Sequence, residues 1–323
     1  MTPPGEKTVM TEHPCPLPYR YRMSGLNVAS EIALPQRTAV GSNAAFDADV
    51  TMHVGDVPAS LEQTTHEGPN WSVDARSFLL DLPGIGRFMA SEGSRLTVCP
   101  APGVPVDDIL VFATGTALSA ILYQRGAMLL HGSAVVRDGR AFVFCGPSGA
   151  GKSTLSGALW RAGCSFLSDD LCSVTQAADG TPLIEPDGRT LRLYRDSIDR
   201  LRLADAVGPP VRRRVDKYHV APQSEETEGA HGVPLGAIYM LADTNPAQPA
   251  GIVEFPPLVA AQALLRKAYR RRLALAYSAK GQLAARTAAL LSHARVYHLR
   301  RPRDLARLDE MVDDLTAHWA RLS

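Results

Sequence analysis

The sequence predicts an α/β fold in which a central, mostly β sheet is flanked by helices and preceded by a small β-rich region. Three observations support this prediction. Short strands separated by turns fill residues 19 to about 100. A strand, a glycine-rich loop and an amphipathic helix follow one another between residues 141 and 163. From residue 235 onward, strands again alternate with helices rich in alanine, leucine and arginine.

The first 105 residues divide into a leader and a β-rich domain. Residues 1–18 are rich in proline and polar side chains, and we expect a flexible leader. The N-terminal domain is expected to span residues 19–105. Its predicted strands are Tyr19–Val28, Ala48–Val54, Trp71–Leu80, Gly86–Ala90 and Arg95–Cys99.

The third predicted domain covers residues 106–323 and contains the glycine-rich loop. It begins with a helix from about Val106 to Gln124, whose first turn carries two aspartates that suit the positive end of the helix dipole. Residues 205–232 are polar and are expected to form a loop. The other predicted elements are strands at Met128–Val136, Ala141–Cys145, Ser165–Ser168, Leu171–Thr175, Leu235–Ala242 and Val296–Leu299, a helix after the glycine-rich loop that ends at Gly163, one or two helices within Leu258–Leu291, and a helix from Pro302 to about Leu322.

The charge balance and the cysteine content limit the classes of protein to which this chain can belong. The 34 basic and 33 acidic residues nearly cancel, so the chain lacks the basic field of a general nucleic-acid binder. The five cysteines are scattered, which favours reduced thiols over a disulfide framework or a zinc site. The sequence shows no signal peptide, and its longest apolar stretch, Ile109–Leu122, is short for a membrane span. We therefore expect a cytoplasmic protein without nucleic-acid or membrane partners.

Residues 146–153 match the phosphate-binding pattern G-x-x-x-x-G-K-[ST] in full, between an apolar strand and a helix. Glycines let backbone N–H groups turn inward on phosphate oxygens, and the helix N-terminus adds partial positive charge. Lys152 is expected to reach the β- and γ-phosphates, and the Ser153 hydroxyl to ligate Mg²⁺. ATP and Mg²⁺ are thus the predicted cofactors. The predicted nucleotide-binding residues are Gly146, Pro147, Ser148, Gly149, Ala150, Gly151, Lys152, Ser153 and Thr154.

Two sequence features flank residues 146–153, which we call the P-loop. His131 opens a strand one hairpin before the loop, and Asp169-Asp170 stands at the end of an apolar strand sixteen residues after Ser153. A carboxylate within hydrogen-bond reach can orient an acceptor hydroxyl in line with the γ-phosphoryl group. Two plainer interpretations stay open. One is that the histidine has only a structural role. The other is that the Asp pair is a magnesium site of a protein that hydrolyses ATP.

This combination resembles the catalytic domain of the HPr kinase/phosphorylase family, which carries a His-Gly strand, a Gly-x-Ser-Gly-x-Gly-Lys-Ser loop and a strand ending in Asp-Asp. The resemblance covers residues 128–175 tightly and the rest of the C-terminal region loosely. It implies that Asp169 is the general base, that His131 tunes its proton affinity, and that Asp170 assists Ser153 at the metal. The family's second signature, Glu-x-Arg-Gly-x-Gly, is missing, and Glu185 is the nearest replacement.

A closer resemblance is to HPr-kinase-like proteins encoded beside lasso-peptide precursor genes. The similar segments are Tyr21–Glu31, Gln124-Arg125-Gly126 and Leu299–Pro302. Such proteins phosphorylate a seryl hydroxyl, typically at the C-terminus of a precursor peptide. The resemblance therefore implies a peptide or protein acceptor bearing a Ser hydroxyl.

Two cations after the core are candidate substrate ligands. Lys217 and Arg214 lie in a polar stretch that could close over the phosphates or clamp a substrate carboxylate. The alternative is solvated loop charge.

The leading hypothesis is an ATP-dependent serine kinase with a peptide or protein acceptor. The alternatives are a nucleotide-binding regulatory switch that transfers no phosphate and a small-molecule hydroxyl kinase. Whether the chain forms a homo-oligomer is left open by the sequence.

Overall fold

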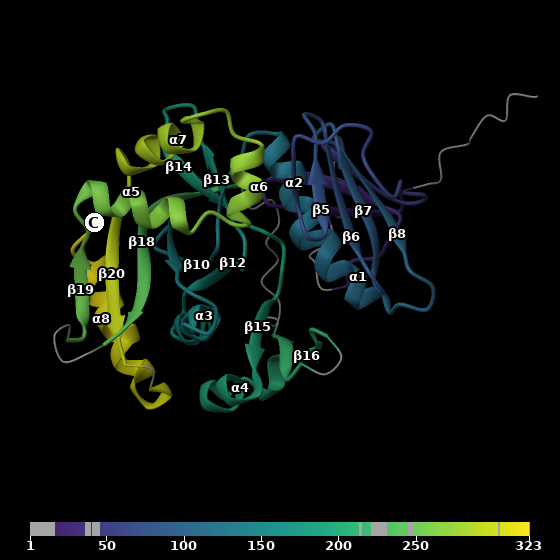
Figure 1. Cartoon of the computed structure of the whole chain (residues 1–323). Coiled ribbons are helices and arrows are strands. Elements are labelled where there is room, and N and C mark those ends of the chain that lie inside the picture. Colours follow the sequence, from purple (N-terminus) through teal and green to yellow (C-terminus); the bar gives the residue numbers. More distant parts are fainter. Residues whose placement is uncertain are drawn as a thin grey trace, which may run out of the picture.

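The computed structural model describes residues 17–35, 40, 46–212, 215–220, 231–244, 249–302 and 304–322 (Figure 1). It confirms the predicted mixed α/β class, with a helix-flanked sheet and a β-rich N-terminal region. The predicted leader lies almost entirely outside the described residues.

The N-terminal region is one eight-stranded sheet with the order β1-β2-β3-β8-β7-β6-β5-β4. Its neighbours are antiparallel except for the pairs β2–β3 and β3–β8. In chain order the strands are β1 (Tyr19–Met23), β2 (Leu26–Ser30), β3 (Val50–Val54), β4 (His66–Gly68), β5 (Trp71–Val73), β6 (Ser77–Leu82), β7 (Gly86–Ser91) and β8 (Arg95–Pro100).

Two predicted strands of this region are each two strands in the structure. Tyr19–Val28 is broken at Ser24 and Gly25, whose positive φ angles of 52° and 84° make a hairpin turn. Trp71–Leu80 is broken after Val73, where the Asp74 carboxylate accepts the backbone N–H groups of Arg76 and Ser77. Both breaks are made by short polar or glycine turns inside an otherwise continuous apolar pattern.

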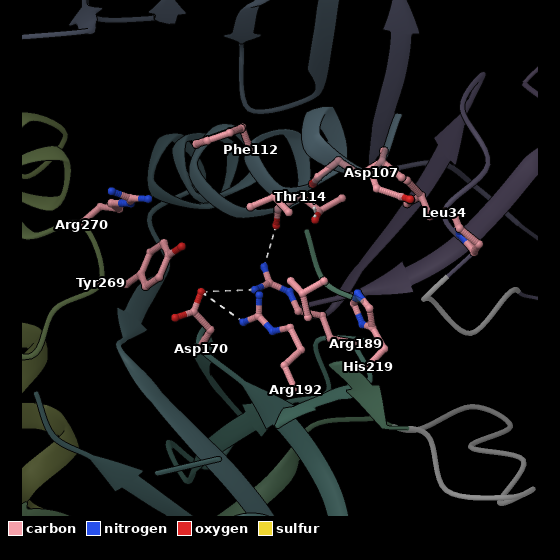
Figure 2. Close-up of a pocket in the computed structure, with 14 residues that line it drawn as sticks. Leu34, Asp107, Phe112, Thr114, Asp170, Arg189, Arg192, His219, Tyr269 and Arg270 are labelled. Atoms are coloured by element: carbon pink, nitrogen blue, oxygen red, sulfur yellow. Dashed lines mark hydrogen bonds and ion pairs between the residues drawn. The ribbon is translucent and has the colours of Figure 1, made fainter. Parts of the chain in front are cut away.

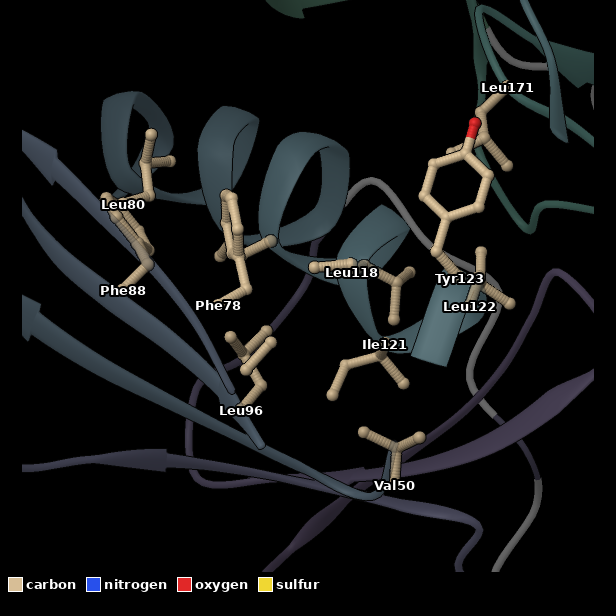
Figure 3. Packing of buried hydrophobic residues seen from close by; sticks show 14 of the residues in the cluster. Val50, Phe78, Leu80, Phe88, Leu96, Leu118, Ile121, Leu122, Tyr123 and Leu171 are labelled. Carbon is tan, nitrogen blue, oxygen red and sulfur yellow. The ribbon is translucent and has the colours of Figure 1, made fainter. Parts of the chain in front are cut away.

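The predicted helix 106–124 runs unbroken, but its middle is wider than an α-helix. It consists of α1 (Val106–Phe112), the π-helical segment η1 (Ala113–Ala117) and α2 (Leu118–Gln124). Figure 3 shows this helix packed on the N-terminal sheet, with Leu118 and Ile121 facing Phe78 and Leu96. By length and composition alone this is the one helix of the described residues that could cross a membrane, and 67% of its most apolar window is buried in the fold.

This packing bears on the domain boundary that the sequence suggested at residue 105. The helix shares one hydrophobic core with the N-terminal sheet. The same core also includes Leu129, Leu171 and Leu273 of the P-loop unit, so we propose that this helix is the element through which the two units pack together.

The P-loop unit is built on a nine-stranded sheet. Seven strands follow the order β12-β10-β11-β18-β14-β13-β9, and β20 pairs with both β18 and β19. The pairs β11–β18 and β18–β20 are parallel. The strands are β9 (Met128–Leu130), β10 (Gly132–Arg137), β11 (Arg140–Cys145), β12 (Ser165–Asp169), β13 (Cys172–Gln176), β14 (Pro182–Glu185), β18 (Val233–Asp243), β19 (Gly251–Glu254) and β20 (Arg295–Arg301).

Helices cover both faces of this sheet, and side chains alternate between them along β11. Phe142 and Phe144 pack with α3 (Lys152–Arg161), α4 (Arg195–Leu201) and α8 (Leu308–Trp319). Val143 and Cys145 pack on the opposite face with α5 (Pro257–Arg266) and α7 (Gln282–Leu291) (Figure 1). The core therefore holds the end of β11 rigidly where the P-loop begins.

The region expected to be one or two helices within 258–291 contains three. A short helix, α6 (Arg271–Ala276), lies between α5 and α7. Arg270, with φ of 46°, precedes α6, and Gly281, with φ of 82°, precedes α7. These left-handed residues interrupt a continuous helical pattern. The C-terminal helix α8 also begins later than predicted, after the 3₁₀ turn η3 (Leu305–Arg307).

A small three-stranded sheet was not predicted. It has the order β15-β17-β16, with β15 (Leu191–Tyr194), β16 (Val207–Pro210) and β17 (Lys217–Val220), and the 3₁₀ turn η2 (Ala204–Ala206) precedes β16. The expectation of a loop across 205–232 is therefore wrong for β16 and β17. These strands have only four residues each and contain glycine, proline or charge, so none of them is long enough to be recognised from alternation alone.

Candidate active site

The strand register brings the distant sequence motifs together at one edge of the large sheet. In the antiparallel pair β10–β11, Gly132 lies opposite Cys145, so His131 and the first P-loop residue are close in space. In the antiparallel pair β10–β12, Ser133 lies opposite Asp169. The start of β10 thus meets the ends of both neighbours, and the predicted histidine, loop and Asp pair converge there.

The P-loop has the shape of an open cradle. Gly149 and Gly151 have φ angles of 76° and 78°, and α3 begins directly afterwards at Lys152. A Cβ on Gly149 would meet nothing within 4 Å, so this glycine faces open space. A Cβ on Gly151 would approach the Arg301 Nη2 atom at 2.5 Å. The Arg301 guanidinium supports the loop from β20 by donating to the Ala150 carbonyl at 2.8 Å.

Gly151→Ala is expected to destabilise the ligand-free protein more than Gly149→Ala does. A left-handed conformation costs an alanine about 1–2 kcal/mol at either position. At Gly151 the new Cβ must also displace Arg301 from its hydrogen bond, which costs about 1 kcal/mol more. Chemical denaturation of the two variants would measure the difference, and equal losses would show that Arg301 yields freely.

The Lys152 side chain is buried against the P-loop. Its Nζ atom donates to the carbonyl oxygens of Gly146 and Pro147 at 3.2 and 3.1 Å. Burial lowers the pKa of Lys152, and the charges of Asp169 and Asp170 offset part of that effect. The ammonium group is therefore held at the loop by weak partners that a phosphate oxygen can replace.

Ser153 and Asp169 form the contact on which a metal site depends. The Ser153 hydroxyl donates to Asp169 Oδ1 at 2.8 Å, and the Asp169 side chain is only 2% exposed. The other carboxylate oxygen, Oδ2, is buried without a hydrogen bond among the described residues and lies 3.6 Å from Arg192 Nε. The described residues contain no cluster of three His, Cys, Asp or Glu side chains that could hold a metal alone. One hydroxyl and one carboxylate fit Mg²⁺, which usually completes its shell with water and phosphate oxygens.

Asp170 adopts a left-handed backbone conformation, with φ of 80°, and points to a different set of partners. His131 Nδ1 lies 3.2 Å from Asp170 Oδ1, and Arg189 and Arg192 lie 3.6 and 3.4 Å from Asp170 Oδ2. Burial acts to raise the pKa of Asp170, but the His131 hydrogen bond and the two guanidinium groups hold it well below its usual range. Asp170 is thus a fixed negative charge already matched by cations.

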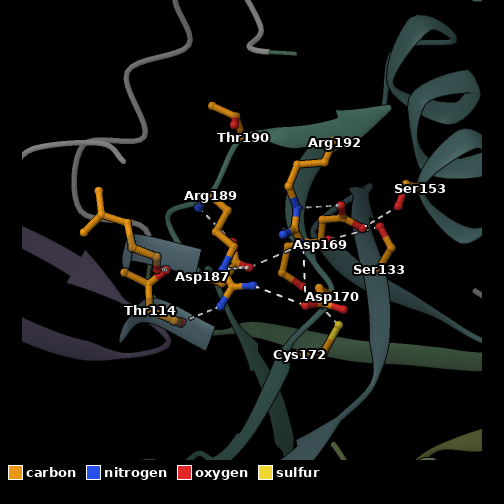
Figure 4. Close-up of polar contacts among 12 residues, drawn as sticks. Thr114, Ser133, Ser153, Asp169, Asp170, Cys172, Asp187, Arg189, Thr190 and Arg192 are labelled. Atoms are coloured by element: carbon orange, nitrogen blue, oxygen red, sulfur yellow. Dashed lines mark hydrogen bonds and ion pairs between the residues drawn. The ribbon is translucent and has the colours of Figure 1, made fainter. Parts of the chain in front are cut away.

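Sequence reasoning missed the charged residues between the small sheet and the Asp pair, which Figure 4 shows. Arg192 comes from β15, and its side chain is 16% exposed beside both aspartates. Arg189 donates to the Thr114 carbonyl in the π-helical segment at 2.6 Å, and its Nε lies 3.4 Å from Asp187. Asp187, rather than Glu185, contacts Asp169: its Oδ2 accepts from the Asp169 backbone N–H at 3.4 Å. Glu185 instead accepts from the Thr175 hydroxyl on the neighbouring strand.

A cavity that opens to solvent lies over the P-loop and joins these groups; the open space within it and at its mouth is about 1210 Å³. Lys217, predicted as a substrate ligand, lines it; burial lowers the pKa of Lys217, and Asp169 offsets part of the effect. Arg214, the other predicted ligand, lies outside the described residues. The predicted residues that line the cavity are His131, Ser148, Gly149, Ala150, Gly151, Lys152, Ser153, Thr154, Asp169, Asp170 and Lys217.

Comparisons with known proteins add little to this geometry. No protein-family model matches the chain, and no curated protein matches it. Among solved structures, an Hpr(Ser) kinase/phosphatase from Coxiella burnetii aligns with 12% identity and a TM-score of 0.30, over 60% of this chain and 97% of that one. At that similarity the match assigns no function, so the function has to be inferred from the geometry of the site.

Proposed function

We propose that this protein is an ATP-dependent kinase that transfers the γ-phosphoryl group to a hydroxyl group of a peptide or protein. The observation that carries the proposal is the Ser153–Asp169 hydrogen bond at 2.8 Å. It places a carboxylate at the end of the P-loop where terminal phosphates bind in such loops. The Asp169 Oδ2 atom is buried beside Arg192 and accepts no hydrogen bond from the described residues, so it can take an acceptor hydroxyl proton once that guanidinium moves aside.

Each residue of the site has a part in this reaction. The acceptor oxygen attacks the γ-phosphorus, the bond from that phosphorus to the β–γ bridging oxygen breaks, and ADP leaves with that bond's electron pair. Asp169 Oδ2 takes the hydroxyl proton. Lys152 and the loop N–H groups stabilise charge on the transferred oxygens. Ser153 and Asp169 would hold Mg²⁺, which offsets charge on the phosphates when bound.

For Asp170 we propose a positioning role rather than metal binding. Its carboxylate contacts His131, Arg189 and Arg192, whereas Ser153 contacts Asp169. Asp170 therefore holds these three side chains around the reacting centre. In this arrangement His131 acts on Asp170 directly and on Asp169 only through it.

The finer proposal is that the acceptor is a seryl hydroxyl, at the C-terminus of a lasso-peptide precursor. It is supported by the sequence resemblance of residues 21–31, 124–126 and 299–302. Two of these segments make hydrogen bonds that hold other parts of the fold in place. Gln124 and Arg125 bind the backbone of Gly93 in the N-terminal sheet, and Arg301 supports the P-loop.

The test is phosphate transfer followed by mass spectrometry. We expect purified protein with MgATP to add one phosphoryl group to a synthetic peptide with a C-terminal serine. The same peptide ending in alanine should stay unmodified, and EDTA should stop transfer. ATP hydrolysis at the same rate with and without acceptors, and no labelled peptide or small hydroxyl compound, would point instead to a nucleotide-dependent regulator.

A further inference from the structure

A second cavity lies beside the nucleotide cavity, and we infer that it binds the acceptor as a chain end that combines one carboxylate with an apolar neighbour. We name it the acceptor cavity; the name rests on the proposed kinase function. It has an empty volume of about 770 Å³. Its apolar wall includes Leu110, Phe112 and Val211, and its cations are Arg189, Arg192 and Arg270 (Figure 2).

The two cavities meet at two shared side chains. Asp170 and Arg192 line both of them. Arg192 lies between the two carboxylates: its nitrogens are 3.6 Å from Asp169 Oδ2 and 3.4 Å from Asp170 Oδ2, and its Nε is buried without a hydrogen bond among the described residues. A small movement of this side chain would expose Asp169 Oδ2 to a group in the acceptor cavity. That is the geometry that proton transfer from an acceptor hydroxyl needs.

The direction of the nucleotide leaves the acceptor cavity free for the other reactant. In P-loops the lysine contacts the terminal phosphates, and the hydroxyl residue after it binds the Mg²⁺ ion that accompanies them. Lys152 and Ser153 therefore mark the terminal-phosphate end, which faces Asp169. The nucleotide cavity also includes Tyr194, Ser197 and Leu305, none of which lines the acceptor cavity, and the Ser197 hydroxyl lies 2.9 Å from that of Thr154. The nucleoside is therefore expected beside these residues and outside the acceptor cavity.

The lining of the acceptor cavity selects the kind of ligand. Arg270 is exposed at its edge, with its guanidinium 5.7 Å from the Tyr269 ring centre, and Arg189 is held by the Thr114 carbonyl inside it. A guanidinium matches the two oxygens of a carboxylate. Asp107 and Asp170 also line the cavity, so a multiply charged anion meets repulsion. One carboxylate beside an apolar side chain fits this mixture best.

The test measures binding separately from transfer. The probe is a short fluorescent peptide that ends in leucine and serine with a free carboxylate, and its C-terminal amide is the comparison. Anisotropy is recorded with a non-hydrolysable ATP analogue present. Arg270→Asn should weaken binding of the acid about tenfold or more, because it removes a charge-assisted hydrogen bond. Asn tolerates the left-handed backbone at this position, where φ is 46°.

Arg271→Asn is the matched control, because Arg271 is the next residue, is exposed and does not line the cavity. We expect it to bind the acid peptide as the wild type does. Equal affinity of both variants, equal affinity for acid and amide, or displacement of the peptide by adenosine would overturn the assignment. Binding as expected without any transfer would keep the peptide site and refute the kinase. If Arg270→Asn transferred phosphate with an unchanged KM for the peptide, the kinase proposal would stand and the acceptor cavity would be refuted as the peptide site.

Discussion

Asp169→Asn is expected to lower phosphoryl transfer by about 100- to 10,000-fold, the usual contribution of a general base. The amide oxygen can still accept the Ser153 hydrogen bond, so the loop and α3 keep their positions. What is lost is the basic oxygen that takes the acceptor proton. ATP affinity should change less than the transfer rate, because the loop amides, Lys152 and the Ser153 hydroxyl are untouched and the new amide oxygen can still face the proposed Mg²⁺ position. Quench-flow transfer and nucleotide titration together would measure both effects.

The control for this variant is Asp81→Asn, which changes an exposed aspartate on β6 of the N-terminal sheet. It should leave transfer and nucleotide affinity unchanged. Thermal unfolding of Asp169→Asn is also needed, because Arg192 loses one of its two acidic neighbours. Transfer at the wild-type rate in a folded Asp169→Asn protein would exclude Asp169 as the base.

Lys152→Met is expected to lower the rate of transfer by about 100- to 1000-fold, as loss of one preorganised donor to a developing charge typically does. ATP affinity should fall as well. Methionine keeps the length and apolar stem of lysine but removes the charge. In the ligand-free protein only the two contacts with the Gly146 and Pro147 carbonyls are lost, so the fold should survive. The assay is single-turnover transfer at saturating ATP.

Lys280→Met provides the comparison, since Lys280 is exposed in the turn between α6 and α7 and lines none of the described cavities near the P-loop. We expect it to behave as the wild type. If Lys152→Met transferred phosphate as fast as Lys280→Met, the loop would not be acting on the terminal phosphates.

The strand, loop and helix that form the phosphate-binding part of this site could be predicted, because each has its own pattern within a short stretch of sequence. The apolar strand β11, the glycines of the loop and the amphipathic helix α3 are contiguous, and each has a recognisable pattern. The resemblance led us to expect His131 beside Asp169; the β10 register brings the two strand ends together, and the histidine contacts Asp170.

The rest of the site depends on contacts between distant segments. Arg192 reaches the Asp pair because β15 pairs with β17, which places Arg192 opposite His219. Neither strand has a periodic pattern long enough to be recognised. Arg189 and Asp187 lie in a connection whose path is fixed only by the buried contacts they make. Arginine is common on protein surfaces, so the residue type alone did not indicate that Arg189 and Arg192 are largely buried.

The hydrogen bond from Arg189 to the Thr114 carbonyl has a consequence for how the chain works as a whole. One guanidinium touches both the helix that belongs to the N-terminal core and the aspartate that borders both cavities. A tilt of that helix would move the carbonyl that holds Arg189, whose positive charge lies next to Asp170. Removing the first third of the protein would therefore leave this buried guanidinium without one of its partners.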